Sequence, residues 1–189
     1  IGIAAIDCGA DAVYIAGPQF GARQAAGNSI DDIRTLCSHA HRFGARIFVA
    51  LNTILYDDEL EAAYRQMLAV QEAGADALIV QDMAVVKMAS EGIGNLKEDF
   101  RIPLHASTQC AIRTPEHAVF LEGLGFSRLI LERELSLDQI KAIRKAVSCE
   151  LEFFVHGALC VCYSGQCYLS EKIAGRSANR GACIQACRS

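Results

Sequence analysis

The cysteines of the chain are crowded at its carboxyl end. Nine are present, and five fall in the last thirty residues, four of them spaced as Cys160-x6-Cys167-x15-Cys183-x3-Cys187. Four thiolates are the usual ligands of structural zinc or of an iron–sulfur cluster. Zinc ribbons favour C-x2-C pairs, which this sequence lacks, and glycine-rich turns with looser spacing suit a cubane. We therefore predict an iron–sulfur cluster, with zinc and metal-free thiols as the alternatives.

A histidine precedes this cysteine-rich stretch. His156 lies four residues before Cys160, so the two side chains could form a thiol–imidazole pair of the kind that activates a nucleophile. Neither a G-x-S-x-G elbow nor an H-E-x-x-H helix is present. The sequence therefore leaves a cysteine hydrolase open as an alternative.

The same tail is locally basic. Residues 171–189 carry four cations and one anion, and Tyr163 and Tyr168 lie just before them. The cations are Lys172, Arg176, Arg180 and Arg188. Basic and aromatic side chains together can contact the phosphates and bases of RNA. The alternative is a solvated basic loop that pairs with acidic helices.

A recurring phrase indicates how these residues are positioned. A glycine followed by a short β-branched run occurs at Gly9, Gly44, Gly74 and Gly125, each time after an amphipathic stretch. A glycine at this place ends a helix, and such a run is typical of a buried parallel strand. Residues 101–107 and 150–157 read as two further strands, which makes six.

Helix signals fill the intervals between these strands. We expect helices within 29–44, 57–74, 114–125 and 136–147, with Ser29, Thr114 and Ser136 as N-caps in three of them. Strands that alternate with helices predict βαβ units and a parallel sheet. The absence of a G-x-G-x-x-G motif disfavours a nucleotide-binding doubly wound sheet.

We predict an α/β fold of the (β/α)8 TIM-barrel type. A complete barrel needs eight strands and typically about 250 residues. The expected barrel is therefore incomplete, with the chain truncated at both ends. Residues 1–157 would form the partial barrel, and 158–189 a cysteine-rich segment that continues beyond the chain.

Polar residues follow the predicted strands. In such barrels the chemistry lies at the carboxyl ends of the strands, so we expect these residues to converge on a pocket. The catalytic candidates are Asn52, Asp82, His105, Gln109, Glu132 and His156. The candidates for binding substrate are Arg23, Arg133, Arg176 and Arg180. Each of three candidates also has a purely structural alternative: Asn52 could cap a turn, Asp82 could cap a helix, and His105 could be a core histidine.

The bulk composition narrows the class of protein. The chain has 189 residues, 52% of them hydrophobic, and a net charge of −4, which is a globular composition without a global basic field. We find neither an apolar run long enough to span a membrane nor a signal peptide. We therefore expect a cytoplasmic protein without membrane contact. An odd cysteine count without a secretory signal also argues against a disulfide scaffold.

Several stretches resemble one family. "EFFVHGALCVCYSGQCYLS" and "GRSANRGACIQACR" are similar to the signature of the peptidase U32 family, whose members are also called collagenase-like proteases. "CGADAVYIAGPQFGAR" near the start, "LNT" and "STQ" match other parts of the pattern. The resemblance covers nearly the whole chain.

The resemblance implies several activities. Its members include proteins that hydroxylate the wobble uridine of tRNA, a cytidine of 23S rRNA or the ring of ubiquinone, without O2 and with prephenate implicated as oxygen source. It also implies a [4Fe–4S] cluster on Cys160, Cys167 and Cys183, with Cys187 or a residue beyond Ser189 as fourth ligand, whereas Cys162 departs from the pattern.

RNA hydroxylation is the function that we predict from these stretches. A redox cluster beside a polar barrel mouth suits oxygen transfer better than it suits hydrolysis. RNA is then the expected partner. The alternatives are a collagenase-like peptidase with a peptide substrate and a non-catalytic protein that binds a partner. Exposed sheet edges could also be covered by a second copy, giving a homo-oligomer.

Overall fold

The computed structural model describes residues 1–23, 26–157 and 159–188. These residues form one parallel sheet whose strand order, β1-β2-β3-β4-β5-β6, follows the chain. The strands are β1 (Ala12–Ala16), β2 (Arg46–Leu51), β3 (Ala77–Val80), β4 (Leu104–Ala106), β5 (Arg128–Ile130) and β6 (Glu150–Glu152). This order has no reversal point, so the sheet is built like a barrel and not like a doubly wound sheet.

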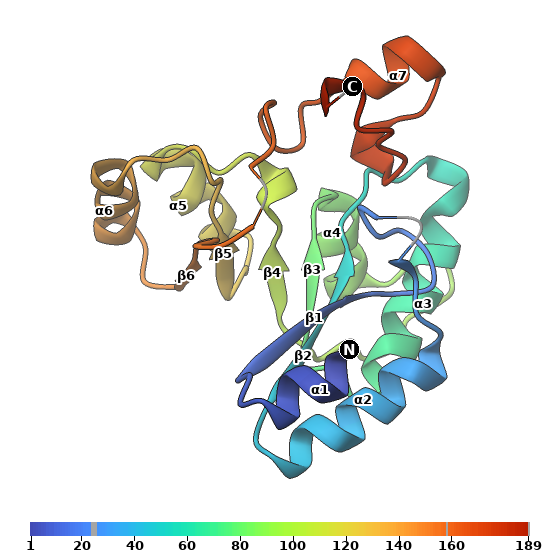
Figure 1. Ribbon diagram of the computed structural model, residues 1–189. Coiled ribbons are helices and arrows are strands. Elements are labelled where there is room, and N and C mark those ends of the chain that lie inside the picture. The colour runs from blue at the N-terminus through green and yellow to red at the C-terminus, as the bar shows by residue number, and fades with distance from the viewer. Residues whose placement is uncertain (24–25, 158, 189) are drawn as a thin grey trace.

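Helices alternate with the strands and cover one face of the sheet (Figure 1). The α-helices are α1 (Gly2–Asp7), α2 (Ile30–Arg42), α3 (Leu60–Glu72), α4 (Met83–Glu91), α5 (Pro115–Gly123), α6 (Leu137–Ala146) and α7 (Leu169–Ala174). Short 3-10 turns are η2 (Asp57–Glu59), η3 (Thr108–Cys110), η4 (Ala178–Arg180) and η5 (Ala186–Arg188). None of the described helices is both long and apolar enough to cross a membrane.

The predicted helix boundaries are confirmed by their caps. Ser29 and Ser136 each form a capping box, and the Thr114 hydroxyl accepts a hydrogen bond from the backbone N–H of His117. At the other ends, Gly44 and Gly74 have φ angles of 72° and 91°, which only glycine adopts without strain. Local signals in the sequence therefore mark where these helices begin and end.

The sheet curls into part of a barrel. The Tyr14 hydroxyl on β1 donates a hydrogen bond to the Glu152 carboxylate on β6, so the first and last strands approach each other across the inner face. A small apolar cluster lines that face, and the larger core lies between the sheet and the helices. The inner cluster comprises Phe48, Ala77, Ile79 and Ile130. The expected incomplete barrel is confirmed.

Two strands are shorter than predicted. The strand expected over 101–107 is limited to Leu104–Ala106, since Pro103 lacks the N–H that a ladder needs. The strand expected over 150–157 ends at Glu152, because its partner β5 ends at Ile130. The residues after Glu152 therefore leave the sheet.

Candidate active site

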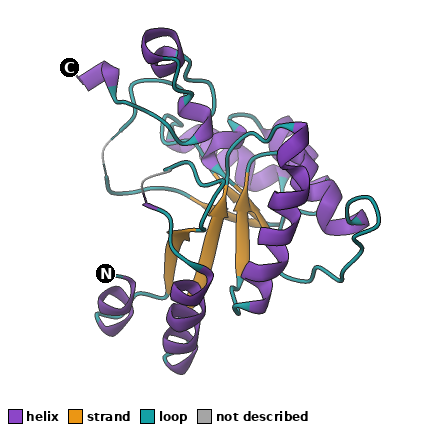
Figure 2. Ribbon diagram, turned by 90° about the vertical axis from the view of Figure 1, so that its right-hand side faces the viewer, coloured by secondary structure: helices purple, strands orange, loops and turns teal. Residues whose placement is uncertain are grey.

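The cysteine-rich segment, residues 159–188, lies at the end of the sheet to which the strands point (Figures 1 and 2). The Asn179 carbonyl accepts a hydrogen bond from the Ile54 N–H at 3.4 Å. Gly165 packs so closely on Gln109 that a Cβ there would collide with the Gln109 carbonyl oxygen. The segment therefore covers the loops that follow β2 and β4, which are part of the expected barrel mouth.

A buried ion pair follows β5 at this mouth. Glu132 is 0% exposed, and its carboxylate accepts hydrogen bonds from Arg113 Nε at 2.5 Å and Nη2 at 3.1 Å. The same guanidinium lies 4.0 Å from the ring centroid of Tyr163 in the cysteine-rich segment. Hydrogen bonding to Glu132 raises the pKa of Arg113, so the guanidinium stays charged near neutral pH. Glu132, Arg113 and Tyr163 form the first of two similar stacks.

The second stack ties η4 to the loop after β2. Arg180 donates to both carboxylate oxygens of Glu59 at 2.9 and 2.6 Å and to the Ile54 carbonyl at 2.7 Å. Its guanidinium lies 4.0 Å from the ring centroid of Tyr56. The hydrogen bonds from Arg180 lower the pKa of Glu59. Arg180, predicted as a substrate ligand, thus has its charge paired within the protein.

Asn52 connects three strand ends. Its side-chain oxygen accepts from the Ala22 N–H at 2.9 Å, and its amide nitrogen donates to the Ser107 hydroxyl at 3.1 Å. The hydroxyl of the next residue, Thr53, donates to the Phe20 carbonyl at 3.2 Å. The predicted convergence at this place is therefore real for the ends of β1, β2 and β4.

Gln81 and Asp82 follow β3. Gln81 donates to the Gln109 carbonyl at 3.2 Å, while its Oε1 atom is buried without a partner among the described atoms. Asp82 is the N-cap of α4, which is the structural alternative given for it from the sequence. Its second carboxylate oxygen accepts a hydrogen bond from the Leu55 N–H. Its carboxylate therefore orders the backbone, and Gln81 is a polar group at the mouth that the site prediction did not include.

A cavity of about 360 Å³ opens beside β1 and β2. Arg23 and Arg180 both line it, so two of the predicted substrate-binding cations do meet there. Arg23 makes no ion pair within the described part of the chain, unlike Arg180. The other two predicted cations lie elsewhere: Arg133 stacks on Phe154 at 5.7 Å, and Arg176 is exposed.

His105 does not lie at the mouth. It sits on the inner face of β4, 4% exposed, with its ring 4.8 Å from that of Phe48. It lines a separate cavity of about 410 Å³ with Arg46 and Arg128, at the amino ends of the strands. Burial lowers its pKa to about 4, so it is neutral near pH 7. The expected position of His105 at a strand end is corrected, and the core-histidine alternative describes it better.

His156 also departs from its expected position. Because β6 ends at Glu152, His156 lies beyond the sheet and is exposed. No hydrogen bond joins His156 to Cys160 within the described residues. The structure therefore does not assemble the thiol–imidazole pair that a cysteine hydrolase would need.

The thiols are only partly gathered. Cys162 is held near Cys167 and Cys160; burial raises its pKa first, and these two neighbours raise it further. The Cys183 sulfur instead accepts hydrogen bonds from the Ser170 hydroxyl and the Gln185 N–H, at 3.7 and 3.4 Å. In the described part of the chain no three Cys, His or acidic residues form a metal-ligand group. Thiolates are suitable ligands for an iron–sulfur cluster, but the described residues do not bring the predicted ligands together. Cys162, which was not among those ligands, lies near Cys160 and Cys167.

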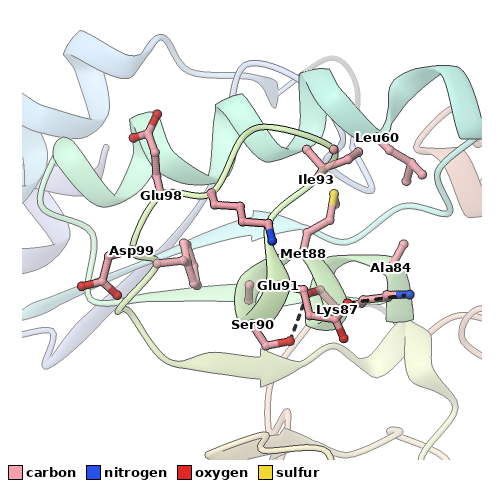
Figure 3. Close-up of a pocket in the computed structure, with 14 residues that line it drawn as sticks. Leu60, Ala84, Lys87, Met88, Ser90, Glu91, Ile93, Glu98 and Asp99 are labelled. Carbon is pink, nitrogen blue, oxygen red and sulfur yellow. Dashed lines mark hydrogen bonds and ion pairs between the residues drawn. The ribbon is translucent and has the colours of Figure 1, made fainter.

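A larger hollow, of about 840 Å³, lies between α4 and the loop that follows it (Figure 3). Leu60, Met88 and Ile93 gather on one side of it, while Glu98 and Asp99 point outward from the loop. It is on the helical side of the sheet, away from the strand ends. We therefore place the candidate site at the mouth beneath the cysteine-rich segment.

The fold and this mouth define an α/β barrel protein with a cysteine-rich cover. The family model of Peptidase family U32 matches residues 2–189, and the chain belongs to that family. A solved U32 peptidase, Mk0906, superposes with a TM-score of 0.63 at 19% identity over 80% of this chain and 63% of that one. At 19% sequence identity the superposition supports a shared fold and nothing further.

Curated relatives carry two kinds of name. The chain is 58% identical to the 23S rRNA 5-hydroxycytidine C2501 synthase of Escherichia coli over 95% of its length, but covers 26% of that protein. It is 36% identical to the tRNA hydroxylation protein P of Escherichia coli, of which it covers 39%. It is 34% identical to a collagenase of Porphyromonas gingivalis, of which it covers 46%. The chain thus spans less than half of each of these relatives.

The structure adds residues that the sequence reasoning missed. None of these residues belongs to a recognisable motif, and each contributes to the site by contacting a partner elsewhere in the chain. They are Arg113, which pairs with Glu132, and Glu59 and Tyr56, which both contact Arg180. Arg180 and Glu59 are 121 positions apart. The sequence signal for these contacts is a basic tail at 171–189 together with an acidic stretch at 57–61. These charges predict that ion pairs form between the two stretches, but they do not predict which residues pair.

Proposed function

We propose that the chain is the barrel part of an enzyme that hydroxylates RNA, with a cytidine of 23S rRNA as the first candidate target and tRNA as the second. The observation that carries this proposal is the 58% identity to the rRNA hydroxycytidine synthase over 95% of the chain, against 36% to the tRNA hydroxylation protein of the same organism. Such a substrate would place the protein in the cytoplasm.

The geometry of the mouth supports this function. Arg23 supplies a cation without an ion pair in the described chain, beside a cavity of about 360 Å³. Gln81 supplies an amide oxygen without a partner among the described atoms, which can accept a hydrogen bond from the edge of a base. A buried polar atom without a partner, such as Gln81 Oε1, is costly unless something binds it. A nucleobase that enters the mouth would offer such a partner.

We also propose that a [4Fe–4S] cluster is held by Cys160, Cys167, Cys183 and Cys187, and that prephenate is the oxygen source. The thiol spacing and the family resemblance support this; zinc is the alternative. Such a cluster would supply electron transfer at the mouth. Because the described residues do not gather these thiols, binding would require the segment that carries them to rearrange. Iron and sulfide analysis after anaerobic purification tests it, and an iron-free, colourless protein would refute it.

The proposed function has a direct test. RNA from cells in which the gene is disrupted should be digested, and the nucleosides of rRNA and tRNA compared separately by mass spectrometry. The loss of hydroxylated cytidine from rRNA supports the first target, and a loss of hydroxylated uridine from tRNA supports the second. Unchanged nucleosides in both fractions would count against RNA hydroxylation.

The collagenase-named relative supports a peptidase as the second candidate. In that case Cys160 with His156 would be the reactive pair. The exposed position of His156 speaks against it. Peptide cleavage that is lost in both Cys160→Ala and His156→Ala would favour the peptidase, whereas cleavage that survives both would exclude this pair.

A further inference from the structure

The two Glu–Arg–Tyr stacks at the mouth have the same arrangement. In each, the guanidinium lies 4.0 Å from a tyrosine ring centroid and is fixed from the side by a bidentate carboxylate. Tyr163 remains 55% exposed and Tyr56 remains 59% exposed. The protein therefore orders the rings of two large side chains without burying them.

Fixing an exposed ring has a physical consequence. A free surface tyrosine loses side-chain freedom when a ligand binds it, and that loss weakens binding. Here the stacked arginine restricts the ring beforehand, and the glutamate restricts the arginine. A preorganised aromatic plane at the edge of a polar site is suited to a flat ligand group.

The position of the two rings narrows the kind of ligand. Tyr56 belongs to the loop after β2, and Tyr163 sits between Cys162 and Ser164, above Arg113 in the loop after η3. Both rings therefore border the mouth, at different strands. A ligand that stacked on both rings would have to carry more than one flat group, which a nucleic acid strand does.

We propose that Tyr56 and Tyr163 are stacking platforms for unpaired RNA bases, so that the substrate is presented as a single strand or loop. This inference rests on the proposed function and deepens it. Stacking of bases on aromatic rings is the common mode of single-strand recognition, and a base inside a duplex cannot use it. Arg23, which makes no ion pair in the described chain, lines the same cavity as Arg180, the cation that stacks on Tyr56, and from there it can meet a phosphate.

A third exposed tyrosine provides a matched control. Tyr168 is in the same segment and is 63% exposed, but no guanidinium stacks on it among the described residues. If exposure alone made a platform, Tyr168 would behave like the other two. If the stacked arginine is required, Tyr168 would not bind a base as Tyr56 and Tyr163 do.

Fluorescence can report base stacking at single positions. The chain has no tryptophan, so Tyr56→Trp, Tyr163→Trp and Tyr168→Trp each introduce one reporter that keeps an aromatic plane. The probe is a short single-stranded oligoribonucleotide of mixed sequence, with the same sequence as a duplex for comparison. We expect the single strand to quench the fluorescence of tryptophan at positions 56 and 163 but not at position 168. At positions 56 and 163 the duplex should quench less strongly than the single strand. Absence of quenching at 56 and 163 would overturn the proposal.

Affinity measurements give a second readout. Tyr56→Leu and Tyr163→Leu should each weaken binding of the single strand by about tenfold, whereas the Phe variants and Tyr168→Leu should bind like the wild type. Equal binding by all variants would overturn the platforms while leaving hydroxylation, which is read separately from cellular nucleosides, untouched. Conversely, intact platforms with unchanged cellular nucleosides would reject hydroxylation but keep single-strand binding.

Discussion

At the scale of single residues, the Arg113–Glu132 pair shows how burial divides the roles of two partners. Glu132 is fully buried, while the Arg113 side chain is 30% exposed. A buried carboxylate that loses its cation has no solvent to replace it, but an arginine at the surface can still reach water. The two deletions of this pair should therefore differ.

Arg113→Ala should destabilise the protein more than Glu132→Ala. We expect a loss of about 3–5 kcal/mol for the arginine deletion, because it leaves an unpaired buried charge, and about 1–2 kcal/mol for the glutamate deletion. The free energies of unfolding from urea titrations measure both. Equal losses would mean that the buried charge is not the source of the cost.

His105 should make stability sensitive to acid. Its folded pKa of about 4 lies below the ordinary value of 6.5, since burial and the Arg128 guanidinium disfavour the charged ring. The unfolded chain therefore takes up a proton first, and stability present above pH 6.5 is lost as pH falls toward 4.

The loss due to His105 should be on the order of 2 kcal/mol. His105→Gln, which cannot titrate, should remove this part of the slope between about pH 7 and about pH 5. Unfolding titrations at the two pH values compare the variant with the wild type. Parallel pH dependence in both would show that His105 is not the group responsible.

At the scale of elements, the sequence predicted what local signals determine. Caps at Ser29 and Ser136 and glycines such as Gly44 place the helices, and β-branched runs place the strands. The end of β6 could not be predicted, because it depends on where β5 stops, not on residues 153–157 themselves. The docking of the cysteine-rich segment could not be predicted either, since ion pairs such as Arg180–Glu59 join positions far apart in the chain.

Gly165 should control that docking. Gly165→Ala would drive a methyl group into the Gln109 carbonyl, so the segment should lift from the mouth and be cut faster in limited proteolysis. Gly175→Ala is the matched control, because Gly175 has a similar φ angle, 62° against 72°, with open space at its Cβ. If both variants are cleaved at the same rate, backbone strain and not the collision explains the effect.

At the scale of the whole molecule, the half-barrel has two polar ends. The mouth joins Asn52, Gln81 and Arg23 beneath the cysteine-rich segment, whereas His105 and Arg46 line the cavity at the opposite end. The general rule that barrels react at the carboxyl ends of their strands located the mouth from sequence. It could not exclude His105, because a three-residue strand offers no pattern that separates its middle from its end.

The most direct test of the account compares these two ends in cells. The gene-disrupted strain should receive Gln109→Ala, whose side chain makes no hydrogen bond within the described residues, or Arg46→Ala at the far end. Mass spectrometry then measures the hydroxylated fraction of the target nucleoside. We predict that the wild type and Arg46→Ala restore hydroxylation and that Gln109→Ala does not. Restoration by Gln109→Ala with failure of Arg46→Ala would contradict the placement of the reaction at the mouth.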